Sequence, residues 1–265
     1  MEPLEGTRVV TIAVNTPGPV AAARLVELGA TVTKVEPPDG DPLALVSREW
    51  YSALAEGQDV RRIDLKTPAG RAALDELVAD ADLLLTSQRP SALARLGVAA
   101  PPNVCHVAIV GYPAPDQEVA GHDLTYVAAR GLLDPPELPR SLIADLGGAE
   151  RAVSAALALL LAGKGGYAEV SLAEAVDFFA APLRRGLTAP GGVLGGGLPV
   201  YDVYAAKEGW IAVAALEPRF QDGLRRELGL DELTKRALSD AFRARSAREW
   251  QRWAHERDLP ISAVS

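Results

Sequence analysis

The sequence predicts an α/β protein in two parts: a large domain built on a parallel β-sheet and a smaller α+β domain. Through most of the chain, short β-branched or apolar runs alternate with segments whose apolar residues recur at helical spacing, which is typical of a parallel sheet with helices on its faces. A glycine-rich tract follows, and after it a hairpin pattern and three helical patterns. We therefore expect a large domain over residues 1–188, a linker over 189–199 and a small domain over 200–265.

The large domain is expected to begin with a strand over Arg8 to Val14. A helix over Val20 to Leu28 ends at Gly29, and a second strand covers Thr31 to Val35. Four further elements repeat this order: strands at Arg62–Leu65, Leu83–Thr86 and Val104–Val110, and a helix from Pro68 to about Val78 capped by Thr67. Right-handed crossovers bring the carboxyl ends of such strands to one edge, where ligands usually bind.

The second half of the chain continues this pattern and then changes character. After Asp145, a helix is expected from Gly147-Gly148 to about Leu161, followed by a strand at Tyr167–Leu172 and a helix at about 173–183. The small domain is expected to hold a hairpin, 200–204 with 210–214, and helices near 219–228, 233–244 and 247–257. No internal repeat is evident.

Composition excludes several classes of function. The chain carries 27 Lys and Arg against 35 Asp and Glu, a formal charge of −8, which argues against general affinity for nucleic acid or anionic membranes but leaves room for a local basic pocket. The single cysteine, Cys105, excludes internal disulfides and fits a reducing cytoplasm. The three histidines show no metal-ligand spacing.

Segment patterns narrow the choice further. The longest apolar stretch, Ala152 to Ala162, is shorter than the roughly 20 residues that a membrane span needs, and the acidic start of the chain lacks the order of a secretory signal. Neither the glycine fingerprint of dinucleotide-binding folds nor a P-loop is present. A nicotinamide dehydrogenase and a P-loop NTPase are therefore disfavoured.

Two segments carry the residues best suited to chemistry. Gly-His-Asp at 121–123 places His122 at one plausible helix start, and Asp145 precedes Gly147 and Gly148 at another. An imidazole and a partly buried carboxylate can act as opposed acid and base, and the glycine N–H groups could stabilise an oxyanion. The alternative is that His122 and Asp145 only cap or pack their helices.

An ordered series of short segments resembles one protein family across nearly the whole chain. The segments are 3–10, Gly18-Pro19, 28–38, 64–70, Arg89-Pro90 with 95–97, 121–123, 144–148, 163–165, 201–204 and 217–220. By these segments the chain resembles class III CoA-transferases (CaiB/BaiF), and most of all their α-methylacyl-CoA racemase branch.

The resemblance implies a Rossmann-like large domain, a small domain and an interlocked homodimer that acts on acyl-CoA with no cofactor beyond the CoA moiety. Asp145 is then the catalytic carboxylate, His122 the second proton-exchanging group that distinguishes racemases from transferases, and Glu217 a support for His122. Lys66, Arg89 and Arg95 match positions near the CoA phosphates. Tyr126 lies one turn from His122 and either lines the acyl or pantetheine passage or packs in the core.

Three functions remain open at this point. The first is an acyl-CoA racemase for 2-methyl-branched thioesters, and the second is CoA transfer with Asp145 as nucleophile. The third is a non-catalytic CoA-binding subunit, suggested by shortened loops and by an early end at Ser265. Arg61 and Arg62 are shifted from the family's basic cluster, and a shift along a strand need not preserve a phosphate contact. For Glu217, which precedes Pro218, the alternative is a purely electrostatic role at a helix start.

Overall fold

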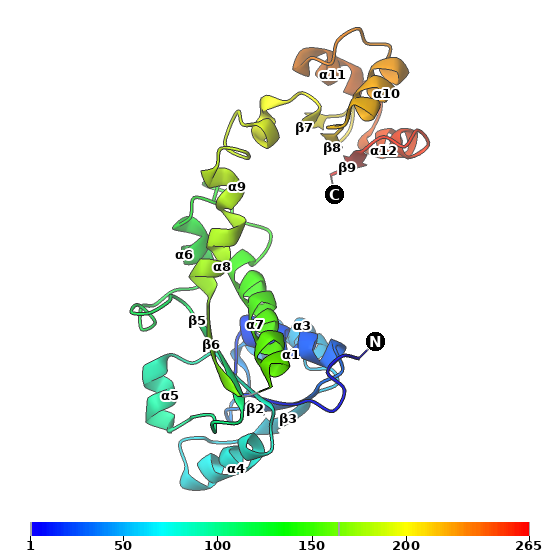
Figure 1. The fold of residues 1–265 in the computed structure, drawn as a ribbon. Coiled ribbons are helices and arrows are strands. Elements are labelled where there is room, and N and C mark those ends of the chain that lie inside the picture. Colours follow the sequence, from blue (N-terminus) through cyan, green and yellow to red (C-terminus); the bar gives the residue numbers. More distant parts are fainter. Residues whose placement is uncertain (1, 164, 265) are drawn as a thin grey trace. The chain divides into compact units, whose positions relative to one another are not determined.

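The computed structural model describes residues 2–163 and 165–264, which divide into two compact units, 1–180 and 181–265 (Figure 1). The first unit holds a six-stranded parallel sheet and the second a three-stranded antiparallel sheet. The predicted α/β fold with a smaller α+β part is therefore confirmed. The division at Ala180 lies eight residues before the predicted end of the large domain.

The parallel sheet has the strand order β3-β2-β1-β4-β5-β6. The chain adds β2 and β3 on one side of β1, and then returns to add β4, β5 and β6 on the other. This reversal creates a topological switch point between β1 and β4, where open α/β sheets bind ligands outside the carboxyl ends of the strands. The strands are β1 (Arg8–Thr11), β2 (Thr31–Glu36), β3 (Asp59–Arg62), β4 (Leu83–Thr86), β5 (Cys105–Val110) and β6 (Gly166–Ser171).

Helices cover both faces of this sheet (Figure 1). One core lies between the sheet and α1 and α7, and a second lies between the sheet and α4 and α5. The helices of the first unit are α1 (Pro17–Glu27), α2 (Pro42–Val46), α3 (Arg48–Leu54), α4 (Pro68–Ala79), α5 (Pro90–Leu96), α6 (Asp123–Ala128), α7 (Ile143–Ala162) and α8 (Leu172–Phe179).

Local sequence signals explain several of these boundaries. The Thr67 hydroxyl accepts a hydrogen bond from the Gly70 N–H at 3.1 Å, and Pro68 occupies the first position of α4, as predicted. A Cβ at Gly70 would lie 2.1 Å from the Asp64 carbonyl oxygen, so only glycine fits there. Gly163 ends α7 in the left-handed conformation, with φ of 69°.

Three predicted boundaries differ from the structure. The third strand covers Asp59–Arg62 rather than Arg62–Leu65, because this exposed edge strand pairs with β2 only over those residues and shows no apolar alternation. The expected helix over 173–183 is two helices, α8 and α9 (Ala181–Arg184), with Pro182 just inside the second. The long helix α7 begins at Ile143, four residues before its predicted start at Gly147.

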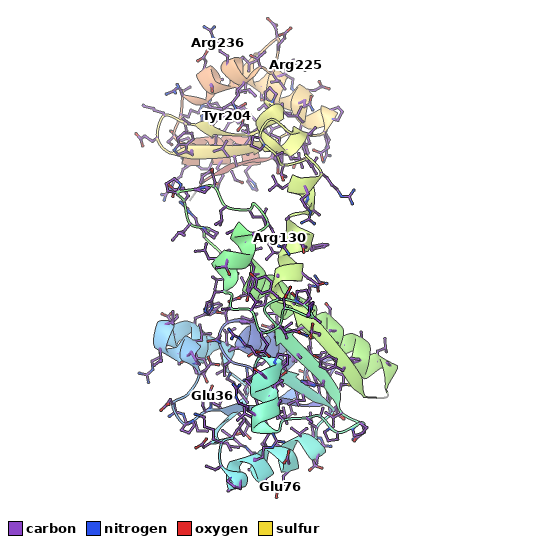
Figure 2. The ribbon with its side chains drawn as sticks, turned by 90° about the vertical axis from the view of Figure 1, so that its left-hand side faces the viewer. Glu36, Glu76, Arg130, Tyr204, Arg225 and Arg236 are labelled. Atoms are coloured by element: carbon purple, nitrogen blue, oxygen red, sulfur yellow. The ribbon has the colours of Figure 1, made fainter. Side chains whose placement is uncertain are left out.

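The second unit has its own apolar core. Its strands are β7 (Tyr201–Ala205), β8 (Trp210–Ala214) and β9 (Ile261–Ala263); its helices are α9, the irregular turn η1 (Val193–Gly197), α10 (Pro218–Leu228), α11 (Lys235–Phe242) and α12 (Ala247–His255). The Trp250 indole N–H donates to the Phe242 carbonyl at 2.7 Å, and the Tyr204 hydroxyl donates to the Pro199 carbonyl at 2.6 Å (Figure 2 labels Tyr204). These bonds satisfy the polar ends of two buried aromatic side chains.

Over the described residues, the structure contains no helix that is both long enough and apolar enough to cross a membrane.

Candidate active site

The site lies around the loops that leave the carboxyl ends of β1 and β4. The Val14 N–H donates to the Ser87 hydroxyl at 2.9 Å, and the Gln88 side-chain amide donates to the Ile12 carbonyl at 2.7 Å. These two bonds join the loops on either side of the topological switch point. They provide a fixed rim for the groups that follow.

Asp123 brings the starts of α6 and α7 together. Its carboxylate is 6% exposed, and its Oδ1 accepts from the backbone N–H groups of Ala144 at 2.7 Å and Asp145 at 3.0 Å. Those N–H groups are in the first turn of α7 and have no partner within the helix. Asp123 therefore caps α7 from another helix, and it places its neighbour His122 beside the start of α7.

Asp145 is the third residue of α7 and is half-buried. Burial raises its pKa to about 6, and the negative charge of Asp123 acts in the same direction, whereas a hydrogen bond from the Thr16 side chain and the charge of His122 lower it. The alternative that Asp145 is merely the helix cap is wrong, because the residue at the cap position is Leu142. A carboxyl group with a pKa near 6 can both lose and regain a proton near neutral pH.

His122 occupies the residue before α6, and its side chain is exposed. Its backbone N–H donates to the Thr125 hydroxyl at 3.0 Å, and that hydroxyl donates to the His122 carbonyl at 2.7 Å. The Thr125 hydroxyl thus holds the backbone on both sides of the imidazole. The charge of His122, 23 residues away in sequence, lowers the pKa of Asp145 slightly against burial. That the two residues act together in proton exchange stays a prediction.

Gly147 and Gly148 do not provide the expected oxyanion site. They are the fifth and sixth residues of α7, where backbone N–H groups bond within the helix. A Cβ at Gly147 would lie 2.4 Å from the Phe179 ring, and one at Gly148 would lie 2.2 Å from Leu172 Cδ2. These glycines instead let α7 and α8 approach closely.

Lys66 and Arg95 line one cavity of about 610 Å³, together with Arg71. Lys66 also lines a second cavity of about 370 Å³, which reaches Ile12 and Gln88 at the sheet edge. Three cations around one cavity suit an anionic group such as a phosphate. Sequence reasoning missed Arg71, whose only signal is its place one helical turn after the Thr67 cap.

Arg89 is exposed and directly precedes α5. The positive charge of Arg89 lowers the pKa of the Tyr126 hydroxyl, although burial raises that pKa more strongly. The same charge lowers the pKa of Glu118, in the same direction as the larger effect of the hydrogen bonds from Ser91. Arg95 also lowers the pKa of Glu118, and it lines the cavity that contains Lys66, whereas Arg89 is not among the residues that line it.

Tyr126 is only 2% exposed and belongs to the core between the sheet and α7. Its ring meets that of Tyr112 edge to face at 5.1 Å, and burial raises its pKa to about 12. A Cβ at Gly111 would lie 2.4 Å from its hydroxyl oxygen. The structure thus supports core packing, and contact with a coenzyme stays a prediction.

Glu217 belongs to the second unit, where it is the exposed residue before α10. Its carbonyl accepts from the N–H groups of Phe220 and Gln221, and Pro218 follows it at the first helical position. This location agrees with the interpretation of a helix start. Its support of His122 stays a prediction.

A buried ionic cluster beside β1 and β2 was missed entirely. Lys34, Glu36 and Asp41 are each at most 3% exposed, and the Lys34 ammonium lies 2.7 Å from Asp41 Oδ2 and 3.7 Å from Glu36 Oε1. The sequence places Lys34 in a predicted strand but indicates no role for Lys34, Glu36 or Asp41, because their burial together depends on tertiary packing.

The fold is an α/β fold built on a parallel sheet, in which Asp123 ties the His122 segment to the start of α7 and Lys66, Arg71 and Arg95 line a cavity between α4 and α5. The chain belongs to CoA-transferase family III, because the model of that family matches residues 4–265.

Similar proteins include both branches of the family. Human α-methylacyl-CoA racemase is 29% identical over 93% of this chain and 74% of its own length, and human succinyl-CoA:glutarate CoA-transferase is 25% identical over 81% of this chain and 57% of its own length. A Mycobacterium tuberculosis hypothetical protein of known structure superimposes with a TM-score of 0.84 at 23% identity, covering all of this chain and 85% of the other. A CaiB/BaiF family protein from Brucella suis gives a TM-score of 0.78 at 22% identity, covering 99% and 84%.

Proposed function

We propose that this protein is an acyl-CoA racemase that inverts the α-carbon of 2-methyl-branched acyl-CoA thioesters. The observation that carries the proposal is that the Asp123 carboxylate, next to His122 in the chain, accepts hydrogen bonds from the N–H groups of Ala144 and Asp145 and so ties the His122 segment to the start of α7. Membership of a family that contains named racemases supports the choice.

In the proposed reaction, one group of the pair removes the α-proton and the other returns a proton to the opposite face. With one enantiomer His122 is the base and protonated Asp145 the acid; with the other the roles exchange. The electron pair left on the α-carbon is delocalised onto the thioester oxygen as an enolate until reprotonation. With a pKa of about 6, Asp145 is roughly one-tenth protonated at pH 7, so both of its forms are available.

The CoA portion is proposed to bind through Lys66, Arg89 and Arg95. Lys66 and Arg95 share the basic cavity between α4 and α5, where they can pair with phosphate oxygens. Tyr126 is proposed to line the acyl or pantetheine passage, and Glu217 is proposed to orient the His122 imidazole. No cofactor beyond the CoA moiety is needed for proton exchange, and an interlocked homodimer in the cytoplasm is the arrangement expected from the family resemblance and the cysteine content.

CoA transfer between carboxylates is the second candidate, because several similar proteins carry transferase names. In that reaction the Asp145 carboxylate would attack the thioester carbonyl and release the CoA thiolate, giving a mixed anhydride. The CoA thiolate would then attack the Asp145 carbonyl of that anhydride and release the donor carboxylate, leaving an Asp145–CoA thioester. Trapping of that thioester by hydroxylamine or borohydride would favour this function. Tight CoA binding with neither activity, and turnover only after a second protein is added, would favour a non-catalytic subunit.

The direct test is solvent exchange at the α-carbon. One epimer of a 2-methylacyl-CoA is incubated with the protein in deuterated water. We expect deuterium at C2, detected by NMR, and loss of stereochemical purity, detected by chiral chromatography. We expect His122→Gln to lower the rate by roughly 10²-fold or more, and His255→Gln, which changes an exposed histidine of α12, to leave it unchanged. Absence of exchange with several acyl chains would contradict the proposal.

A further inference from the structure

The segment that joins β5 to α6, residues 111–122, carries His122 at its end (Figure 1). Its first half is fixed to β6, because the Glu169 carboxylate accepts from the Ala114 N–H at 3.2 Å and from the Gln117 side-chain amide at 3.0 Å. Its second half belongs to no helix or strand. The position of His122 therefore depends on the contacts that this second half and the start of α6 make.

Helix α5 begins without a cap of its own. Arg89, at the cap position, makes no side-chain capping hydrogen bond, and Pro90, the first helical residue, has no N–H. The first available donor is the Ser91 N–H, which has no acceptor within the helix. The Glu118 carboxylate supplies one: its Oε1 accepts from the Ser91 N–H at 2.8 Å, and its Oε2 accepts from the Ser91 hydroxyl at 2.8 Å. Because both carboxylate oxygens are used, this contact fixes direction as well as distance.

Asp123 makes the same kind of contact with α7. The residue at the cap position of α7 makes no side-chain capping hydrogen bond, and Asp123 Oδ1 accepts from the N–H groups of Ala144 and Asp145 at 2.7 and 3.0 Å. Two carboxylates on one short stretch of chain thus cap two different helices from outside, and His122 lies between them in sequence. We call residues 118–123 the strap.

The two helices that the strap caps carry the two ends of the proposed substrate site. Helix α5 places Arg95 on the cavity of about 610 Å³ that Lys66 also lines, and Arg89 directly precedes this helix. Helix α7 carries Asp145 in its first turn. The strap therefore joins the helix proposed to hold the CoA phosphates to the helix that carries the proposed acid–base carboxylate, with His122 between the two contacts.

We propose that Glu118 is a positioning residue that sets the place of His122 relative to CoA bound at α5; this rests on the proposed role of His122 in proton exchange. Asp123 holds the strap at the start of α7, whereas Glu118 holds it at the phosphate-binding helix. Glu118 acts on the reaction only through the backbone of the strap. Its effect is therefore expected only where the substrate itself is held at α5.

The charge of Glu118 gives its removal a second and opposite effect. The hydrogen bonds from Ser91 lower the pKa of Glu118, and the positive charges of Arg89 and Arg95 also lower it, so the carboxylate is ionised near neutral pH. That negative charge opposes the binding of an anionic ligand at the same arginines. Removal of the carboxylate should leave KM for an acyl-CoA unchanged or lower, while the loss of position lowers kcat. General damage to the loop would not spare binding in this way.

The kinetic test compares Glu118→Ala with Glu118→Gln, which remove the same charge. The glutamine side-chain oxygen can still accept from the Ser91 N–H, so only the alanine variant releases the strap. With a 2-methylacyl-CoA we expect Glu118→Ala to lower kcat by roughly 10- to 100-fold without a rise in KM, because small displacements of a reacting group are costly. Glu118→Gln and Asp116→Ala, which changes another exposed carboxylate of the segment, should stay within about threefold of wild type.

Ser91→Ala approaches the same contact from the other side and is informative even if Glu118→Ala does not fold. It keeps the charge of Glu118 and the N–H donor but removes the hydroxyl donor. We expect a smaller loss of kcat than in Glu118→Ala, with KM unchanged.

A truncated substrate separates positioning from general damage. The same acyl group carried on pantetheine lacks the nucleotide and its phosphates, so Arg89 and Arg95 have nothing to hold. We expect wild type and Glu118→Ala to turn over this thioester with kcat values within about threefold of each other. Equal losses of kcat with the CoA and pantetheine substrates, or equal losses in the alanine and glutamine variants, would overturn the positioning role.

The contact itself is measured without substrate. In the full chain labelled with ¹⁵N-serine, the Ser91 amide signal is identified by its absence in Ser91→Ala. Because a hydrogen bond to oxygen shifts an amide proton downfield, this signal should move upfield in Glu118→Ala and much less in Glu118→Gln. An unmoved signal in Glu118→Ala would overturn the proposal at its first step. The expected shift in a protein that exchanges no α-protons would remove the proposed function and the positioning role with it, and would leave a strap that only caps α5.

Discussion

Asp145 shows how far a single residue can be understood from sequence. The sequence points to it as a carboxylate at a helix start, next to glycines and in a family context. Its raised pKa, about 6, comes first from burial and then from Asp123, 22 residues away, and both depend on the packed structure. The chemistry of the residue is thus a property of its surroundings as much as of its type.

The raised pKa has a predicted effect on stability. The folded state binds the Asp145 proton more tightly than the unfolded state, in which the pKa of this group is near 3.8. Ionisation of Asp145 therefore lowers the free energy of unfolding; this loss is absent below about pH 4 and complete above about pH 6. We expect Asp145→Asn to be more stable than wild type at pH 8, by up to about 3 kcal/mol, with the difference vanishing near pH 4.

Urea unfolding of both proteins at pH 8 and pH 4 measures this difference. Asp134→Asn, which changes an exposed carboxylate, should alter the free energy of unfolding by less than about 0.5 kcal/mol at both pH values. Equal stability of Asp145→Asn and wild type at pH 8 would show that burial of the ionised Asp145 carboxylate does not lower the free energy of unfolding.

At the scale of elements, the sequence predicts the central strands and capped helices well because their signals are local. Thr67-Pro68 starts α4 and Gly163 ends α7, and β4 matches its predicted bounds. The short helices α2, α3 and α5 and the strand β9 were missed, since each holds seven residues or fewer and has little periodicity; for α6 the sequence predicted only its start, at His122. The edge strand β3 was displaced because pairing, rather than pattern, defines it.

The contact of α7 with α8 gives a matched pair of substitutions. Gly148→Ala should destabilise the protein by roughly 1–3 kcal/mol, because the added Cβ meets Leu172, which is 8% exposed and has little room to move. In Gly147→Ala the added Cβ meets the end of the Phe179 ring, which is 45% exposed and can rotate away. Because alanine favours a helix over glycine, we expect this variant to be as stable as wild type or up to about 1 kcal/mol more stable.

Thermal and urea unfolding of the two variants provide the comparison, with circular dichroism to confirm unchanged helix content. Equal losses of stability in both would show that the Phe179 ring is as fixed as Leu172. A stabilised Gly148→Ala would contradict the close packing of α7 against α8.

At the scale of the whole molecule, each compact unit contains its own core. The first unit has apolar clusters on both faces of the parallel sheet, and the second has a cluster around Phe242, Trp250 and Trp253. The glycine-rich composition after Ala189 predicts a linker over residues 189–199 between the two domains. The structure sets the division at Ala180 because contacts within each unit, rather than composition, define it.

Limited proteolysis tests this division. Trypsin should cut early after the exposed Arg185, at the start of the second unit, and yield two fragments that resist further digestion. Mass spectrometry identifies the cut, and an Arg184→Gln, Arg185→Gln double variant should be cut much more slowly. Rapid degradation of either fragment, with native circular dichroism lost at the first cut, would show that the units do not hold their folds separately.

The sequence by itself determined the α/β class, the family and the residues with the right chemistry, because strand and helix periodicity, caps and short motifs are written in neighbouring residues. Only the tertiary structure decided that Asp123 ties the His122 segment to the start of α7, that Gly147 and Gly148 serve packing, and that Lys34 is buried with Asp41 beside the loop after β1. Each of these depends on contacts between distant segments and on burial, and both of these exist only once the chain is packed.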